Sequence, residues 1–186
     1  MVSKPDILVF AGPNGSGKST FVSAKPPIGV YVNADDIASA TGISMLEAAL
    51  EAEKLREYCL AEGLPFSFET VLSTERNLDL LRRAVTSGRC IESIFVLTVD
   101  PELNAQRIAR RVAEGGHDVP AEKIRSRYTK TLANLPKLVQ LSTICTVYDN
   151  TWQPEIIYRK DDAGEVVTPT LRWPEEVIRK LVYGST

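Results

Sequence analysis

Apolar residues along the first 150 positions fall into five short runs, and longer amphipathic segments separate them. The runs are Asp6 to Ala11, Val30 to Ala34, Phe66 to Val71, Ile91 to Val99 and Thr143 to Tyr148. Most of them are too continuously apolar to leave one face in water, which is typical of strands covered by helices on both sides. The alternation therefore predicts an α/β fold with a parallel five-stranded sheet flanked by helices.

Terminus signals mark the helices between these runs. Ser44 and Glu47 have the spacing of a capping box at the start of one helix. Asp100-Pro101 indicates a second start, with an N-cap aspartate and proline at the first helical position. A long helix begins at Pro120, and Pro136 is expected to interrupt or kink it.

The pattern changes after residue 150. Two short runs, Glu155 to Arg159 and Glu165 to Thr168, flank the turn residues 161–164, and a helical pattern begins at Pro174. These features predict a small C-terminal hairpin followed by a helix. The chain has 186 residues and no fixed-period repeat, so we expect a single domain over residues 1–186.

Composition narrows the class of partner. Lys plus Arg is 22 against 24 for Asp plus Glu, a formal net charge of −2, so the overall field favours neither a nucleic acid nor an anionic membrane. The apolar stretch near the start, 7–11, is far shorter than the roughly 20 residues of a membrane helix, and we expect a cytoplasmic protein. Cys59, Cys90 and Cys145 are widely spaced and His117 stands alone, which argues against a disulfide framework or a zinc site.

A glycine-rich segment follows the first apolar run directly and matches the phosphate-binding pattern G-x-x-x-x-G-K-[ST]. Its residues are Gly12, Pro13, Asn14, Gly15, Ser16, Gly17, Lys18, Ser19 and Thr20. Glycines allow the backbone to approach phosphate oxygens closely and to point successive N–H groups at them. Lys18 would carry positive charge to the β- and γ-phosphates, and the Ser19 hydroxyl would ligate Mg²⁺. The sequence therefore predicts that a nucleotide and Mg²⁺ bind here.

What the nucleotide is used for depends on other residues. A switch GTPase would carry an Asn-Lys-x-Asp element, which this sequence lacks. A motor ATPase would show an apolar strand ending in a metal-binding carboxylate, and 94–100 superficially offers one. Asp100 precedes Pro101 and a helical pattern, however, so a helix cap explains it at lower cost. A kinase instead needs a base, groups that orient the acceptor, and positive charge over the transferred phosphoryl group.

Acidic candidates stand at the ends of the second and third runs. Asp35 and Asp36 follow the second run, and either could be the base, while the other would cap the next helix. Glu69, with Thr70, ends the third run amid apolar residues, where an acid is costly unless paired or functional. We expect Glu69 to contact substrate hydroxyls or the metal.

Basic candidates gather in a helix–glycine–helix region, about 101–135, that resembles a lid in composition. Arg107, Arg110 and Arg111 share one helical face opposite an apolar one, and either a phosphate-binding or an ordinary solvated role fits them. Gly115-Gly116 and His117 lead into a second helix that carries Arg125 and Arg127. His117 fits either a phosphate or substrate contact or an ordinary polar loop. Arginines on a glycine-hinged helix pair are suited to closing over a triphosphate.

Taken together, these motifs resemble the zeta-toxin family of P-loop kinases over roughly residues 5 to 150. The motifs are 12–20, Asn33-Ala34-Asp35-Asp36, Phe68-Glu69-Thr70, Arg111 with Gly115-Gly116-His117 and Val119-Pro120, Arg127-Tyr128, and Tyr148-Asp149-Asn150. The resemblance implies a kinase-type P-loop sheet, transfer of phosphate from ATP with Mg²⁺ to a hydroxyl of a UDP-amino sugar, and an antitoxin partner. It favours Asp35 as base, Glu69 as a sugar contact, and Arg111 and Arg127 at the phosphates.

The sequence departs from the family in two respects. The stretch between Asp36 and Glu69 has little room for a large sugar-nucleotide pocket, and Arg110 could replace Arg111. The sequence therefore predicts an ATP-dependent small-molecule kinase. Its alternatives are another small hydroxyl acceptor, such as a nucleoside, antibiotic or sugar, and a regulatory ATPase in which Asp100 holds the metal.

Overall fold

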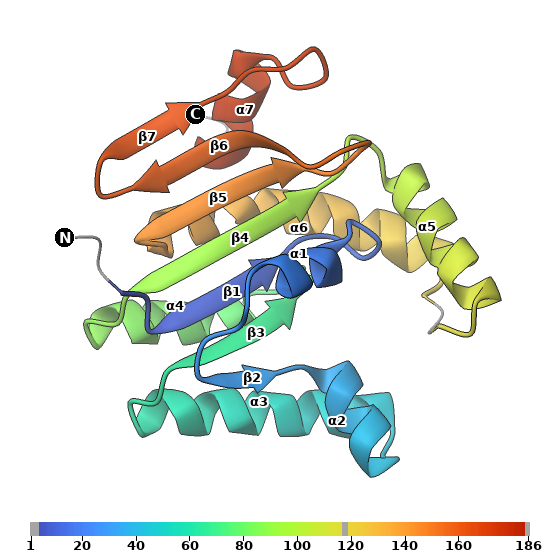
Figure 1. Ribbon diagram of the computed structural model, residues 1–186, viewed down its shortest axis with the longest axis vertical. Coiled ribbons are helices and arrows are strands. Elements are labelled where there is room, and N and C mark those ends of the chain that lie inside the picture. The colour runs from blue at the N-terminus through green and yellow to red at the C-terminus, as the bar shows by residue number, and fades with distance from the viewer. Residues whose placement is uncertain (1–3, 117–118, 185–186) are drawn as a thin grey trace.

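A seven-stranded sheet forms the centre of the computed structural model, which describes residues 4–116 and 119–184, and its strand order is β2-β3-β1-β4-β5-β6-β7 (Figure 1). The strands are β1 (Ile7–Ala11), β2 (Val30–Val32), β3 (Phe66–Thr70), β4 (Ile91–Leu97), β5 (Ile144–Asp149), β6 (Glu155–Asp161) and β7 (Gly164–Val167). The first five in this order run parallel, as predicted.

The predicted five-stranded sheet is two strands short. The C-terminal hairpin does not stand apart, because β6 pairs antiparallel with β5 from Cys145 opposite Lys160 to Asp149 opposite Glu155. β7 pairs in turn with β6. The hairpin thereby satisfies the backbone groups that β5 would otherwise expose at a sheet edge.

Seven helices connect and cover the strands within the described parts of the chain. They are α1 (Lys18–Ala24), α2 (Ala34–Thr41), α3 (Met45–Ala61), α4 (Arg76–Thr86), α5 (Pro101–Ala113), α6 (Ala121–Leu141) and α7 (Glu175–Tyr183). The capping box of Ser44 and Glu47 is present at α3. Asp100 caps α5 and accepts a hydrogen bond from the Glu102 amide at 2.8 Å.

Pro136 was expected either to interrupt or to kink its helix, and the interruption is wrong, because α6 continues to Leu141. Leu135, Leu138 and Val139 on either side of the proline are buried in the main core. Burial of these side chains outweighs the missing backbone hydrogen bond and the proline strain of about 3 kcal/mol.

Apolar side chains on the two faces of β1 enter two different clusters. Ile7 and Val9 pack into the large core together with side chains from α3, α4, α6 and α7. Leu8 and Phe10 point to the opposite face and pack with Phe21 of α1. Figure 1 shows α1 on one face of the sheet, with α4 and α6 on the other. Coverage on both faces explains why the runs read as continuously apolar.

The parallel strands all end at the same edge of the sheet, where α/β folds place their ligands. The glycine-rich loop follows β1, Asn33 follows β2, and Glu69 and Thr70 end β3. The chain reverses direction across the sheet at β1, which lies between β3 and β4. Among the described residues, no helix has both the length and the apolar character needed to span a bilayer.

Candidate active site

The glycine-rich loop occupies residues 12–17, between the end of β1 and the start of α1. Gly12 has φ +145°, and a Cβ atom there would lie 2.0 Å from the carbonyl oxygen of Val96. Gly17 has φ +94°, and a Cβ atom there would lie 2.4 Å from Nδ2 of Asn150. These glycines are required by packing against β4 and the segment after β5, in addition to any approach by phosphate.

Lys18 is the first residue of α1, and its ammonium lies under the loop. Its Nζ donates hydrogen bonds to the carbonyl oxygens of Gly12 (2.9 Å) and Pro13 (3.0 Å). Burial lowers the pKa of Lys18 to about 8; the charge of Glu69 opposes this shift, that of Arg111 adds to it, and that of Asp35 opposes it. The Lys18 ammonium therefore interacts electrostatically with the charged side chains of the other candidate site residues.

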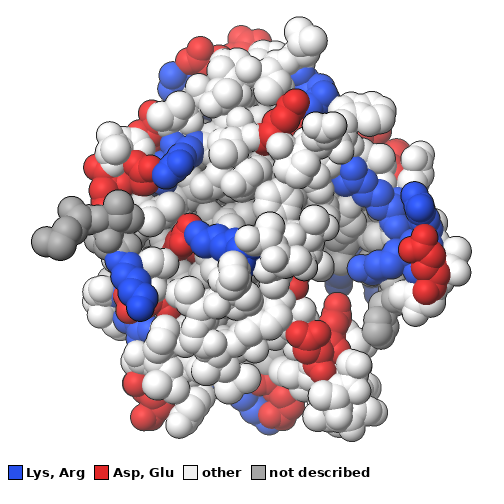
Figure 2. All heavy atoms as spheres, viewed as in Figure 1, with Lys and Arg blue, Asp and Glu red and all other residues white. Residues whose placement is uncertain are grey.

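A cavity of about 830 Å³ opens beside the loop, within the size range of small-molecule sites. The loop and the start of α1 contribute Asn14, Gly15, Gly17, Lys18 and Ser19 to its wall. Apolar side chains from α3, α5 and the segment just before α6 line the wall as well, among them Met45, Ile108 and Val119. In Figure 2 the surface is hollowed between α2, where acidic side chains gather, and α5, where basic ones gather.

The structure brings together most of the residues singled out from the sequence. Asp35, Glu69, Thr70, Arg111 and Arg127 line the cavity together with Lys18 and Ser19. The predicted residues Gly12, Pro13, Ser16, Thr20, Asp36 and Arg110 lie outside its wall. The Arg110 side chain is 84% exposed and pairs with Glu114, so Arg111 is the better placed of the two. His117 lies outside the described residues.

Asp35 and Asp36 both lie in the first turn of α2, where negative charge is favourable. The expectation that one of them caps this helix is wrong. The cap is Asn33, which has extended backbone geometry and whose side chain accepts a hydrogen bond from the Asp35 amide at 2.9 Å. The carboxylate of Asp35 is thereby left for the cavity.

Glu69 is both paired and placed at the cavity. Its Oε1 accepts hydrogen bonds from the Tyr31 hydroxyl (2.6 Å) and from Nδ2 of Asn33 (3.1 Å). Burial of the Tyr31 hydroxyl, and then its hydrogen bond to Glu69, raise the pKa of Tyr31. Thr70 stabilises the segment that follows β3, because its hydroxyl accepts hydrogen bonds from the Leu72 amide (2.9 Å) and from Nδ2 of Asn77 (2.8 Å).

Two residues of the site, Lys123 and Tyr31, were not predicted from the sequence. Lys123 lines the cavity and lies four residues before Arg127, so the helical period could have placed both on one face. Tyr31 lies in a short strand, where a tyrosine is ordinarily an apolar packing residue, and no pattern in the sequence links it to Glu69.

Arg107 has a specific structural contact that the helical face alone did not predict. Its Nη2 donates hydrogen bonds to the carbonyl oxygens of Asn150 and Thr151, both at 2.9 Å. The side chain therefore anchors α5 to the segment after β5 while also touching the cavity wall.

A glycine-rich loop whose lysine is partly buried, set between a central parallel strand and a helix, defines a P-loop nucleotide-binding domain. The AAA domain family matches residues 7–133, more than half of the chain, and the chain belongs to this family. An uncharacterized protein of Haemophilus influenzae is 25% identical over 127 residues, which cover 65% of this chain and 91% of the relative.

Solved structures share the whole architecture. A chain in the crystal structure of AvrRxo1-ORF1:-ORF2 with ATP superposes with a TM-score of 0.71 and 15% identity over 98% of this chain, which spans 65% of that longer chain. A chain from the PezAT chromosomal toxin-antitoxin system of Streptococcus pneumoniae gives 0.61 and 17% over 100% of this chain and 81% of its own. The predicted α/β fold, with a mostly parallel sheet flanked by helices, is thereby confirmed.

Proposed function

We propose that the protein is an ATP-dependent kinase that transfers the γ-phosphoryl group to a hydroxyl of a small molecule. The observation that carries this proposal is the convergence of Lys18, Asp35, Glu69, Arg111 and Arg127 on one cavity at the glycine-rich loop. A phosphate-binding loop alone fits many functions, but carboxylates and arginines facing it supply the base and the charge that phosphoryl transfer needs. A structural neighbour in complex with ATP supports the choice of nucleotide.

Each side chain has a defined role in this proposal. The loop amides and Lys18 hold the phosphates, and Glu69 orients the acceptor. The acceptor oxygen forms a bond to the γ-phosphorus while the bond from that phosphorus to the β–γ bridging oxygen breaks, which releases ADP. Asp35 takes the hydroxyl proton, and Arg111 and Arg127 offset the charge on the transferred group.

The donor set at the loop fits Mg²⁺. The Ser19 hydroxyl and the carboxylates of Asp35 and Glu69 line the same cavity, and Mg²⁺ prefers such oxygen ligands together with phosphate oxygens. We propose Ser19 as the protein ligand. When bound, the ion would neutralise charge on the β- and γ-phosphates.

For the acceptor we propose a UDP-amino sugar, with an antitoxin as protein partner. Lys123 on α6 offers positive charge for a diphosphate, and the toxin-antitoxin source of one structural neighbour supports this biological setting. Another small hydroxyl compound would use the same phosphate and base groups. A regulatory ATPase is disfavoured because Asp100, its candidate metal ligand, caps α5 and lies outside the cavity wall.

The test is ADP production from ATP and Mg²⁺, with and without UDP-N-acetylglucosamine, by wild type, Lys18→Ala and Asp35→Asn. Turnover stimulated by the acceptor and lost in both variants is expected. Asp36→Asn is the matched control, because it removes the same charge from the same helix turn outside the cavity. Turnover that ignores every acceptor and survives Asp35→Asn would contradict the kinase proposal.

A further inference from the structure

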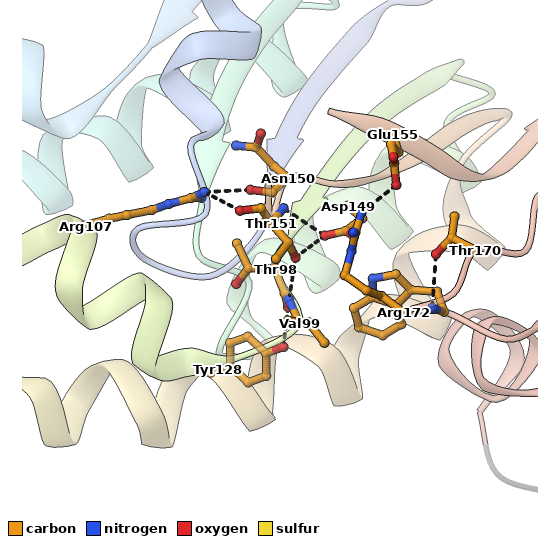
Figure 3. A network of polar contacts seen from close by, with 11 residues as sticks. Thr98, Val99, Arg107, Tyr128, Asp149, Asn150, Thr151, Glu155, Thr170 and Arg172 are labelled. Carbon is orange, nitrogen blue, oxygen red and sulfur yellow. Dashed lines mark hydrogen bonds and ion pairs between the residues drawn. The ribbon is translucent and has the colours of Figure 1, made fainter. Parts of the chain in front are cut away.

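The segment directly after β5 contacts the glycine-rich loop. Nδ2 of Asn150 donates a hydrogen bond to the carbonyl oxygen of Ser16 at 2.8 Å. Ser16 is fully buried, so water cannot replace this donor. Figure 3 shows Asn150 beside Asp149 and Thr151, with Arg107 of α5 reaching the backbone of Asn150 and Thr151 and Arg172 of the C-terminal segment reaching Asp149.

Asn150 also leaves no room for a side chain at Gly17, the next residue of the loop. The same Nδ2 atom would lie 2.4 Å from a Cβ atom at Gly17, so the amide packs directly on the loop backbone. Asn150 therefore contacts two consecutive residues, Ser16 and Gly17, immediately before Lys18. The N–H groups of this stretch are the ones that a P-loop presents to phosphate, and their alignment determines how well they bind it.

Asn150 is itself held on both sides. Arg107 donates hydrogen bonds to the carbonyl oxygens of Asn150 and Thr151. The Thr151 hydroxyl accepts a hydrogen bond from the Val99 amide at 3.0 Å. Asp149, whose side chain is fully buried, accepts hydrogen bonds from the Thr151 amide (2.9 Å) and from Nε of Arg172 (2.8 Å). The segment 149–151 is thus fixed by Val99 after β4, by α5 and by the stretch before α7.

We propose that Asn150 is a positioning residue for nucleotide binding, and that it holds residues 16–17 of the loop in the geometry that receives phosphate. Asn150 lies beyond residue 133, where the match to the AAA domain family ends, so the C-terminal part of this chain completes the nucleotide site. The inference rests on the proposed binding of ATP at the loop. It assigns Asn150 no contact with the nucleotide.

The test measures the dissociation constants of ADP and ATP, each with Mg²⁺, by calorimetry on the full chain. Asn150→Ala is expected to weaken both about tenfold, because a loop carbonyl and two loop residues lose their fixed partner. The matched control is Asn134→Ala, which also removes a side-chain amide donor to a buried backbone carbonyl, that of Leu72 at 3.0 Å. The control is expected to lower the melting temperature comparably and to leave nucleotide affinity within twofold of wild type.

Thr151→Val provides a second variant that keeps side-chain volume. It removes the hydroxyl that holds the segment to the Val99 amide, just after β4, without touching the loop. It should weaken ADP binding about threefold. Nucleotide affinity within twofold of wild type in both Asn150→Ala and Thr151→Val would overturn the inference, as would equal weakening in Asn134→Ala. If wild type binds neither nucleotide, or if Lys18→Ala binds them as tightly as wild type does, the proposed nucleotide site itself is wrong.

Discussion

The ammonium of Lys18 connects nucleotide binding to pH. Its pKa in the free protein is about 8, chiefly because of burial. Phosphate oxygens stabilise the charged form, so ATP binding raises this pKa and draws a proton into the site above about pH 8. The dissociation constant for ATP should therefore change little from about pH 7 to about pH 8 and then increase by up to tenfold per pH unit.

Calorimetry at about pH 9 in two buffers of different ionisation enthalpy measures the expected proton uptake. Lys18→Arg is the control, because a guanidinium stays charged throughout this range. An equally steep pH dependence in Lys18→Arg would show that another group is responsible.

The same pKa predicts how stability depends on pH. The unfolded chain holds the Lys18 proton up to a pKa of 10.5, whereas the folded protein releases it near 8. Between these values the unfolded state binds more protons, so the contribution of Lys18 to the free energy of unfolding should increase as pH rises. Urea denaturation of wild type and Lys18→Met across this interval measures the difference. If wild type instead lost stability relative to Lys18→Met as pH rises, the lowered pKa of Lys18 would be contradicted.

Tyr31 is expected to orient Glu69 for the acceptor. Tyr31→Phe removes a hydroxyl donor to Oε1 of Glu69 while keeping the aromatic ring. Because hydrogen bonds to charged groups are worth about 1.5–3 kcal/mol, and this one is partly exposed, we expect KM for the acceptor to rise about tenfold and KM for ATP to change little. Tyr58→Phe, at a tyrosine that is 57% exposed, is the control. An equal rise in both KM values would show a general disturbance of the site.

At the scale of the element, the start of α2 couples the two carboxylates of the site. The Asn33 side chain accepts from the Asp35 amide and donates to Glu69. Asn33→Ser keeps a capping oxygen but loses the side-chain amide that reaches Glu69, whereas Asn33→Ala loses both. Asn33→Ala should therefore lower the free energy of unfolding by about 1 kcal/mol relative to Asn33→Ser. Both variants should raise KM for the acceptor, as measured by urea denaturation and steady-state kinetics in parallel; equal stability of the two would contradict the cap.

The elements show which features the sequence could predict. The apolar runs predicted β1, β3 and β4, because those strands are buried on both faces and such strands appear in the sequence as continuous apolar runs. The hairpin was predicted, but its pairing with β5 was not, since pairing partners are distant in sequence and leave no local pattern. Pro136 was misread for a related reason, because packing against the sheet overrides a local propensity.

The candidate site also has a part that the sequence predicts and a part that only the structure shows. Lys18, Asp35 and Glu69 lie at strand ends or in a motif, where chain order alone predicts a common edge. The contacts of Tyr31 with Glu69 and of Asn150 with Ser16 join residues far apart in sequence. Such side-chain pairings depend on the completed sheet, so they could be found only in the structure.

At the scale of the whole molecule, Arg172 joins the C-terminal segment to the sheet edge that carries the loop. It donates hydrogen bonds to Asp149 (2.8 Å) and Glu155 (2.6 Å). The hydrogen bond to Asp149, and then the charges of both carboxylates, raise the pKa of Arg172. Asp149 is fully buried, so a variant without the guanidinium leaves a carboxylate that water reaches poorly. Removing one partner of a buried pair costs 3–5 kcal/mol, and because the Arg172 side chain is 28% exposed we expect about 2 kcal/mol for Arg172→Gln.

Urea denaturation of Arg172→Gln and Arg179→Gln measures whether burial of the partner determines this loss. Arg179 also pairs with a carboxylate, that of Glu175, but both side chains are more than half exposed. Its loss should change the free energy of unfolding by less than about 0.5 kcal/mol. Arg172→Lys should recover only part of the stability, because an ammonium cannot reproduce the two-sided contact of the guanidinium. Equal losses in the two glutamine variants would mean that the C-terminal segment is held by apolar packing around Trp173 and Ile178 rather than by its link to Asp149.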